Sequence, residues 1–428
     1  MRRALFVLTV FMLLVAVGWL AWVLGRGVSA YPLPAPEVDV SALSPADRAP
    51  WIERGRYLAR LANCEACHAS PDGLAYAGGV ALESPFGVFY GTNITPSRSH
   101  GIGGWTPDDM FRVLRWGIMP DGGRLYPSMP YTSYHNMTRA DSDAIWAYLM
   151  ALPPVERPNR AHDIGFPYNI RIGVEFWNLL YRPSSPMEPV PGQEDAWNRG
   201  RYLVDAVAHC GECHTPRNAL YAMQPDEYLL GETIDGALAP DISPAGLARR
   251  GWSPGDLSRY LQTGMSPQGA PNFRMAPVVT HGTRYLTDPD LHAIVAYLTQ
   301  DMPAAPDQPP VLAEGAAVDH AGRDLYLGLC AGCHEATGQG RPFGSPSLIT
   351  NTSLRLRDPL NLMRVIVEGI EQRDLPGLNR TQGMPAFGHL LSDAEIADLT
   401  NYLRTTWGAQ PGAIAPDQIT RARNPAPN

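Results

Sequence analysis

The longest apolar stretch of the chain lies near its N-terminus. Ala4–Leu24 is an uncharged run of 21 residues. As a helix it would be about 31 Å long, which matches a hydrocarbon core of about 30 Å. Arg2 and Arg3 precede the run, and arginines favour the cytoplasmic side of a membrane. The pattern predicts a transmembrane helix, with residues 1–30 acting as an anchor. The alternative is a cleaved signal, because Val28-Ser29-Ala30 is similar to a cleavage site.

Beyond this run, apolar residues recur at helical spacing in three repeats of one pattern. Each repeat is expected to contain an opening, a middle and a closing helix. The opening helices are predicted at residues 53–63, 198–209 and 321–329. The middle helices are predicted to follow the N-caps Thr106, Ser253 and Asp358, each of which precedes a proline. The closing helices are predicted to begin at Thr138, Thr287 and Ser392.

The repeats and the proline-rich stretches between them divide the chain. No long alternating strand pattern occurs, so the predicted fold class is all-α. The three small helical domains are predicted at residues 51–152, 196–302 and 317–410. Proline-rich linkers are predicted at 153–195 and 303–316, and a C-terminal tail at 411–428.

Composition narrows the functional classes. The formal net charge is −8, which argues against a nucleic-acid partner. No glycine-rich fingerprint for a dinucleotide or a phosphate loop occurs in the sequence. The chain has six cysteines, and all of them fall in three copies of one motif, so none is left over for a disulfide framework. The copies are Cys64-Glu-Ala-Cys67-His68, Cys210-Gly-Glu-Cys213-His214 and Cys330-Ala-Gly-Cys333-His334.

Two cysteines three residues apart, followed at once by histidine, are the attachment signature of a c-type haem. The cysteines form thioethers with the vinyl groups, and the histidine is placed to bind iron. A redox dithiol would not need the histidine or the threefold repeat. A structural zinc site needs four ligands, and each repeat offers only two cysteines and one reliable histidine. We therefore predict three covalently bound haem c groups, held by Cys64, Cys67, His68, Cys210, Cys213, His214, Cys330, Cys333 and His334.

A second iron ligand is expected further along each repeat. Met129 follows His68 by 61 residues, and Met275 follows His214 by the same 61. The third repeat offers Met384, 50 residues after His334. All three methionines lie in proline-containing loops, and a thioether is a soft ligand that raises the potential of haem iron. The predicted iron ligands are therefore His68 with Met129, His214 with Met275, and His334 with Met384.

Longer stretches of the sequence resemble a known family. The block from Phe86 reads FGVFYGTNITP, that from Leu125 reads LYPSMPYTSY, and that from Phe166 reads FPYNIRIGVEFWNLLY. With these blocks, residues 51–410 resemble the triple-haem cytochrome c subunits of bacterial membrane-bound dehydrogenases. The resemblance implies three tandem cytochrome c domains behind one N-terminal transmembrane helix. It also implies the same histidine and methionine ligands.

The resemblance implies electron transfer. A large dehydrogenase subunit (a quinoprotein, flavoprotein or molybdenum enzyme) would oxidise an alcohol, aldehyde or sugar acid in the periplasm. The chain would pass the electrons to membrane ubiquinone or to a downstream oxidase of the respiratory chain. With both axial positions of each iron filled, the chain is not expected to be catalytic alone. It would be anchored in the cytoplasmic membrane with its bulk in the periplasm.

Two other functions remain open at this point. The first is a stand-alone membrane-anchored cytochrome that shuttles electrons between respiratory complexes. The second is a haem enzyme such as a peroxidase, or a gas sensor, which requires at least one iron with an open position. The three methionines speak against the second alternative.

Overall fold

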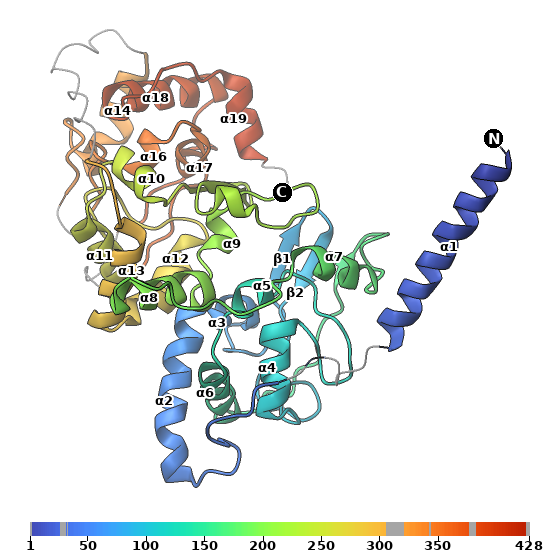
Figure 1. Cartoon of the computed structure of the whole chain (residues 1–428). Helices are drawn as coiled ribbons and strands as arrows, with labels where there is room; N and C mark the ends of the chain where they lie inside the picture. Colours follow the sequence, from blue (N-terminus) through green and yellow to red (C-terminus); the bar gives the residue numbers. More distant parts are fainter. Residues whose placement is uncertain are drawn as a thin grey trace. The chain divides into compact units, whose positions relative to one another are not determined.

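The computed structural model describes residues 2–25, 31, 33–304, 321–341, 344–375 and 382–424. Val28–Ala30, most of the predicted linker 303–316 and residues 317–320 lie outside the described residues. The chain divides into two compact units. Figure 1 labels their helices and strands. Unit 1 comprises Met1–Arg56, Thr95–Glu156 and Ile164–Pro186. Unit 2 comprises Tyr57–Ile94, Arg157–Asp163 and Met187–Asn428.

Unit 1 is built from helices. They are α1 (Arg2–Gly25), α4 (Pro107–Trp116), α5 (Tyr131–Tyr134), α6 (Arg139–Met150) and α7 (Gly173–Tyr181), together with most of α2 (Pro45–Leu61). The predicted N-caps of α4 and α6 are confirmed. The Thr106 hydroxyl accepts from the backbone N–H of Asp109, and the Asp109 carboxylate accepts from that of Thr106. Thr138 caps α6 in the same way by accepting from Asp141.

The apolar N-terminal run forms most of the helix α1. Side chains along it, such as Phe6, Phe11 and Leu14, are exposed. Among the helices that the structure describes, none meets the combined requirement of length and apolarity for crossing a bilayer. The prediction of a transmembrane helix at Ala4–Leu24 is therefore corrected.

Unit 2 contains short antiparallel hairpins as well as helices. Strands β1 (Ala81–Ser84) and β2 (Gly87–Tyr90) pair with Ala81 opposite Tyr90. The two-residue strand β3 (Asp163–Ile164) falls at the sequence boundary of the two units. Strands β4 (Gly231–Ile234) and β5 (Ala237–Pro240) pair with Gly231 opposite Pro240. The expectation of an all-α fold is therefore wrong: the chain is 46% helix and 7% strand. Each long strand has only four residues, which is too short for alternation to stand out in the sequence.

The helices of unit 2 follow the predicted order. In the second repeat they are α8 (Asp195–Tyr202), η2 (Leu203–Val207), α9 (Gly211–His214), η3 (Pro225–Glu227), α10 (Pro244–Arg249), α11 (Pro254–Thr263), α12 (Met275–Pro277), η4 (Val278–Gly282), η5 (Thr283–Tyr285) and α13 (Asp288–Thr299). In the third they are α14 (Ala321–Leu329), α15 (Ala331–His334), α16 (Thr352–Arg355), α17 (Leu360–Glu368), α18 (Asp393–Thr406) and α19 (Pro416–Arg423). The short helix α3 (Cys64–His68) completes the set.

Most predicted helix starts in unit 2 are confirmed. The side chains of Ser253, Thr287 and Ser392 cap α11, α13 and α18. The middle helix of the third repeat differs, because α17 begins only at Leu360 with Pro359 at its N-cap. The Asp358 carboxylate still accepts a hydrogen bond from the backbone N–H of Leu360 at 2.9 Å. Asp358 therefore makes a capping hydrogen bond although it lies one residue before the N-cap.

The same close contact between a glycine and a backbone carbonyl occurs in all three repeats. Gly55 lies against the carbonyl of Ala144, Gly200 against that of Ala293, and Gly322 against that of Asp398. At each place a β-carbon would overlap the carbonyl oxygen of the closing helix. The opening and closing helices of each repeat thus cross at a glycine, eight to ten residues before the first cysteine. In the third repeat α14 packs on α18 at this crossing, in the orange and red part of Figure 1.

Candidate haem-attachment sites

Each cysteine motif forms a single helical turn. These turns are α3, α9 and α15, and Cys210 and Cys330 are the N-cap residues of the last two. Residues three apart lie on the same face of a helix, so the paired cysteines share one side of the turn. None of the six cysteines, all of which the structure describes, takes part in a disulfide bond. The turns therefore present two thiols and one imidazole side by side.

Each motif histidine is oriented by a backbone carbonyl. The Nδ1–H of His68 donates to the carbonyl of Thr92 at 2.7 Å, and that of His214 to Pro240 at 2.7 Å. His334 donates to Pro346 at 3.2 Å. A carbonyl only accepts, so the proton of each imidazole is on Nδ1 and the lone pair of Nε2 is free for a metal.

The hairpins explain why these carbonyls lie where they do. Pro240 ends β5, and Thr92 follows β2 by one residue beyond Gly91. A β-carbon on Gly91 would overlap the carbonyl oxygen of Cys67, so only glycine allows this strand to approach the first motif. In the third repeat a bridge between Arg341 and Ser345 replaces the hairpin, and the Ser345 hydroxyl donates to the Cys333 carbonyl at 2.5 Å.

Burial keeps the motif histidines neutral. It lowers the pKa of His214 to about 4, and it also lowers the pKa of His68 and of His334. The hydrogen bond from each Nδ1–H to its carbonyl raises the pKa, but the effect of burial is larger. A neutral imidazole is the form that binds a metal. These side chains are therefore ready to serve as iron ligands near neutral pH.

Burial also makes the thiols poor nucleophiles. It raises the pKa of Cys64 to about 12, with a smaller contribution from the Cys67 thiol. It also raises the pKa of Cys210 to about 12, with smaller contributions from the Asp205 carboxylate and then the Cys213 thiol. It raises the pKa of Cys330 to about 11. Reactive dithiols need a lowered pKa, so the redox-dithiol alternative is disfavoured. Within the described ranges, no group of three or more His, Cys, Asp or Glu side chains is arranged to hold a metal ion.

Two of the predicted methionine ligands lie in unit 2. Met275 begins α12. Met384 forms an antiparallel bridge with Ile370 and packs on the core of the third repeat, as does Cys330. The Cys333 thiol also lies 3.9 Å from Oε1 of Gln382, two residues before Met384. The third motif and its predicted methionine are therefore close neighbours. Met129 lies in unit 1, whereas His68 lies in unit 2.

The residues of the motifs fit a covalently held haem. Two thiols on one face of a turn match two vinyl groups, and the adjacent imidazole presents a free Nε2. The buried, neutral state of these groups suits a large apolar ring better than it suits a hydrated ion. Cys64, Cys67 and His68, with their counterparts in the other two repeats, are therefore the residues that would hold the group.

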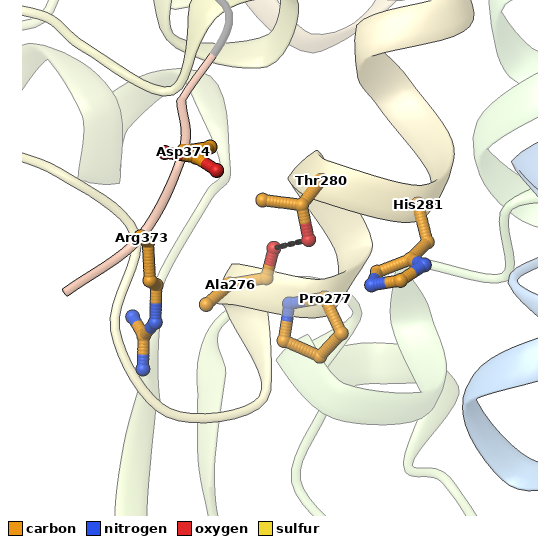
Figure 2. A pocket seen from close by; sticks show the side chains of 6 residues that line it. All are labelled: Ala276, Pro277, Thr280, His281, Arg373 and Asp374. Atoms are coloured by element: carbon orange, nitrogen blue, oxygen red, sulfur yellow. Dashed lines mark hydrogen bonds between the residues drawn. The ribbon is translucent and has the colours of Figure 1, made fainter. Parts of the chain in front are cut away.

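A surface hollow lies beside Met275 and carries no comparable chemistry. It has a volume of about 330 Å³ and is lined by Ala276, Pro277, Thr280, His281, Arg373 and Asp374 (Figure 2). The Thr280 hydroxyl donates to the Ala276 carbonyl at 3.0 Å (Figure 2). The hollow is open to solvent, whereas a substrate pocket encloses most of its ligand. We assign no substrate to it.

Sequence reasoning missed the carbonyls that orient the histidines. A signal for two of them was present, because Thr92 precedes Asn93-Ile94-Thr95-Pro96 and Pro240 precedes Asp241-Ile242-Ser243-Pro244. A similar block, with isoleucine and proline at the same positions, therefore follows the acceptor residue in the first two repeats. Sequence reasoning also gave no role to His209, whose Nε2 lies 3.2 Å from the Ala62 carbonyl oxygen.

Comparison with known proteins supports the haem interpretation. The sequence profile of the family described as Cytochrome c matches residues 320–407. This is a single recognised cytochrome c domain, so the expectation of three tandem cytochrome c domains is corrected on this point. The profile match covers the third motif, including Cys330, Cys333 and His334.

Three relatives match most of the chain. The fructose dehydrogenase cytochrome subunit of Gluconobacter japonicus is 37% identical, over 87% of this chain and 83% of its own. The cytochrome c subunit of the quinone alcohol dehydrogenase of Gluconacetobacter polyoxogenes is 37% identical, over 87% of this chain and 84% of its own. The gluconate 2-dehydrogenase cytochrome c subunit of Pantoea cypripedii is 33% identical, over 83% of this chain and 86% of its own. The chain belongs to this family of dehydrogenase cytochrome c subunits.

Proposed function

We propose that the chain carries three covalently bound haem c groups and passes electrons from a periplasmic dehydrogenase to ubiquinone or another component of the respiratory chain. The observation that carries this proposal is the repeated histidine geometry. In each repeat the motif histidine donates its Nδ1–H to a backbone carbonyl and keeps Nε2 available. When bound, the haem supplies the reversible one-electron chemistry.

The protein's part is to hold and tune these groups. His68, His214 and His334 would each supply one iron ligand, and Met129, Met275 and Met384 the other. The carbonyls of Thr92, Pro240 and Pro346 fix the ring orientation and increase the basicity of each imidazole. A histidine and a methionine on each iron would leave no ligand position for a substrate, so we assign oxidation of the substrate to a separate subunit.

The partner follows from the family. The relatives are subunits of fructose, alcohol and gluconate dehydrogenases, which oxidise small hydroxylated compounds. We infer a large dehydrogenase subunit as the electron donor, and an alcohol, aldehyde or sugar acid as its substrate. The cysteine motifs support a location on the periplasmic face of the cytoplasmic membrane, because covalent haem attachment in bacteria takes place outside the cytoplasm.

The haem count tests the proposal. The full chain would be expressed with its haem-attachment machinery and its intact mass measured under denaturing conditions, in parallel with the variants Cys64→Ala/Cys67→Ala, Cys210→Ala/Cys213→Ala and Cys330→Ala/Cys333→Ala. The expected result is a wild-type mass that includes three haems and the loss of one haem in each variant. A mass that includes only one haem, retained in the first two variants, would contradict the proposal.

A further inference from the structure

The first and second cysteine motifs lie next to each other in unit 2. Nε2 of His209, just before Cys210, lies 3.2 Å from the carbonyl oxygen of Ala62, two residues before Cys64. The turn α3 packs against η4, which follows the Met275 helix. A β-carbon on Gly282, at the end of η4, would lie 3.1 Å from the Arg60 carbonyl oxygen, so the backbones approach closely. The two attachment segments are therefore held in direct contact.

An ion pair lies at the start of the α12–η4 segment that packs against α3. Arg274, directly before Met275, donates from Nε to the carboxylate of Asp235 in the turn between β4 and β5. The third repeat also reaches this turn, because Nη1 of Arg364 donates to the Asp235 carbonyl at 3.0 Å. The Arg364 guanidinium stacks over the ring of Phe273, 4.7 Å from its centroid. Arg364 thus contacts both of the segments that carry the pair.

The elements that carry this pair pack on both motifs. Asp235 lies in the turn between β4 and β5, and both strands pack against α9, the turn of the second motif. Arg274 is the N-cap residue of α12, which continues into η4, and η4 packs against α3, the turn of the first motif. Charge effects weaken with distance, so the pair acts most strongly on these two neighbouring sites.

We propose that Arg274 and Asp235 form a charge pair shared by the first and second haem sites, where it sets the potentials of two adjacent haems together. This inference rests on the proposed function, because it requires haems at both motifs. A cation near a haem disfavours the oxidised, more positive form and so raises the potential, whereas an anion lowers it. The third site has its own pair, Arg341 with Glu335 at 2.7 Å, beside His334.

Redox titration of the full haem-loaded chain tests the inference. Arg274→Gln should lower two of the three midpoint potentials, and Asp235→Asn should raise the same two. Arg274→Lys keeps the charge and should restore values near those of the wild type. Arg341→Gln serves as the matched control and should lower only the remaining potential.

The outcomes separate an electrostatic role from a structural one. Loss of structure would move the potentials in the same direction in Arg274→Gln and Asp235→Asn, whereas a charge effect has opposite signs. A shift of one potential only, or of the potential that Arg341→Gln moves, would overturn the inference. A chain that holds fewer than three haems would instead refute the proposed function, and the intact mass reports this before the titration.

Discussion

Nε2 of His209 lies 3.2 Å from the carbonyl oxygen of Ala62, although 147 residues separate them. The bond joins the residue before the second cysteine motif to the segment just before the first. Burial lowers the pKa of His209, so the ring is neutral and donates its Nε2 proton to this carbonyl. The relative placement of the two attachment segments therefore depends on a side chain outside either motif.

Replacing His209 with alanine tests this contact. The change removes the imidazole that donates to the Ala62 carbonyl, so this hydrogen bond is lost. The loss should reduce the free energy of unfolding by about 1–3 kcal/mol. Chemical denaturation of the haem-loaded chain measures the loss. His389→Ala is the matched control, because His389 is exposed and its replacement should change the free energy by no more than about 0.5 kcal/mol. Equal effects of the two variants would contradict the account.

His135 should make unit 1 sensitive to acid. Its side chain is fully buried, its Nδ1–H donates to the Arg115 carbonyl at 2.8 Å, and burial lowers its pKa from 6.5 to about 4. Between these two values the unfolded chain binds more protons than the folded chain. The stability that His135 contributes is therefore complete above pH 6.5 and is lost as the pH falls towards 4, by about 3 kcal/mol in total.

The pH dependence of His135→Gln checks this sign. Urea denaturation at pH 7 and at pH 4.5 would be compared between the wild type and the variant. We expect a smaller loss of stability on acidification in the variant, because glutamine does not titrate. An unchanged difference between the two pH values would show that His135 does not titrate in this range.

Two glycines of α14 should respond in opposite ways to alanine. A β-carbon on Gly322 would overlap the Asp398 carbonyl, whereas one on Gly328 would have no heavy atom within 4 Å. Gly322→Ala should destabilise the chain by about 1–3 kcal/mol, and Gly328→Ala should be neutral or stabilise it by up to about 1 kcal/mol. Thermal unfolding of the two variants measures the difference. A similar melting temperature for both would refute the helix crossing at Gly322.

Met384 is the residue that we propose as the second ligand of the third haem iron. Met384→Leu would remove this ligand, so the reduced protein should bind carbon monoxide at one haem. Met363→Leu is the control, because Met363 is buried in the core of the same repeat and is not a predicted ligand. The absorption spectrum after addition of the gas distinguishes them. Binding by neither variant would assign the ligand to another residue.

Local chemistry made much of the helical framework predictable. Thr106, Ser253 and Ser392 cap their helices as expected, because a cap needs only a side chain and a backbone N–H three residues on. The cysteine motifs could also be identified from the spacing of their cysteines and histidines alone. Asp358 shows the limit of such reasoning, since it makes a capping bond although the helix begins one residue later than expected.

The contacts that join the repeats were not predictable from one sequence. Arg364 of the third repeat donates to the Asp235 carbonyl of the second repeat, 129 residues away in the sequence, and the choice of this partner depends on how α17 packs on β5. The four-residue strands were missed for a different reason. Four residues of alternating apolar and polar side chains are too few to identify a strand in a proline-rich chain. These strands nevertheless supply or lead into the carbonyls that orient His68 and His214.

The most direct test of the account is reduction of the chain by the substrate of its partner. The chain would be tagged, purified from mildly solubilised native membranes, and observed at the c-type haem absorption band. Ethanol, acetaldehyde, gluconate, sorbitol and fructose would be added in turn. The account predicts reduction by one of these compounds, with a large dehydrogenase subunit in the purified sample. A single chain that ascorbate reduces and that none of these compounds reduces would contradict it and favour a stand-alone electron shuttle.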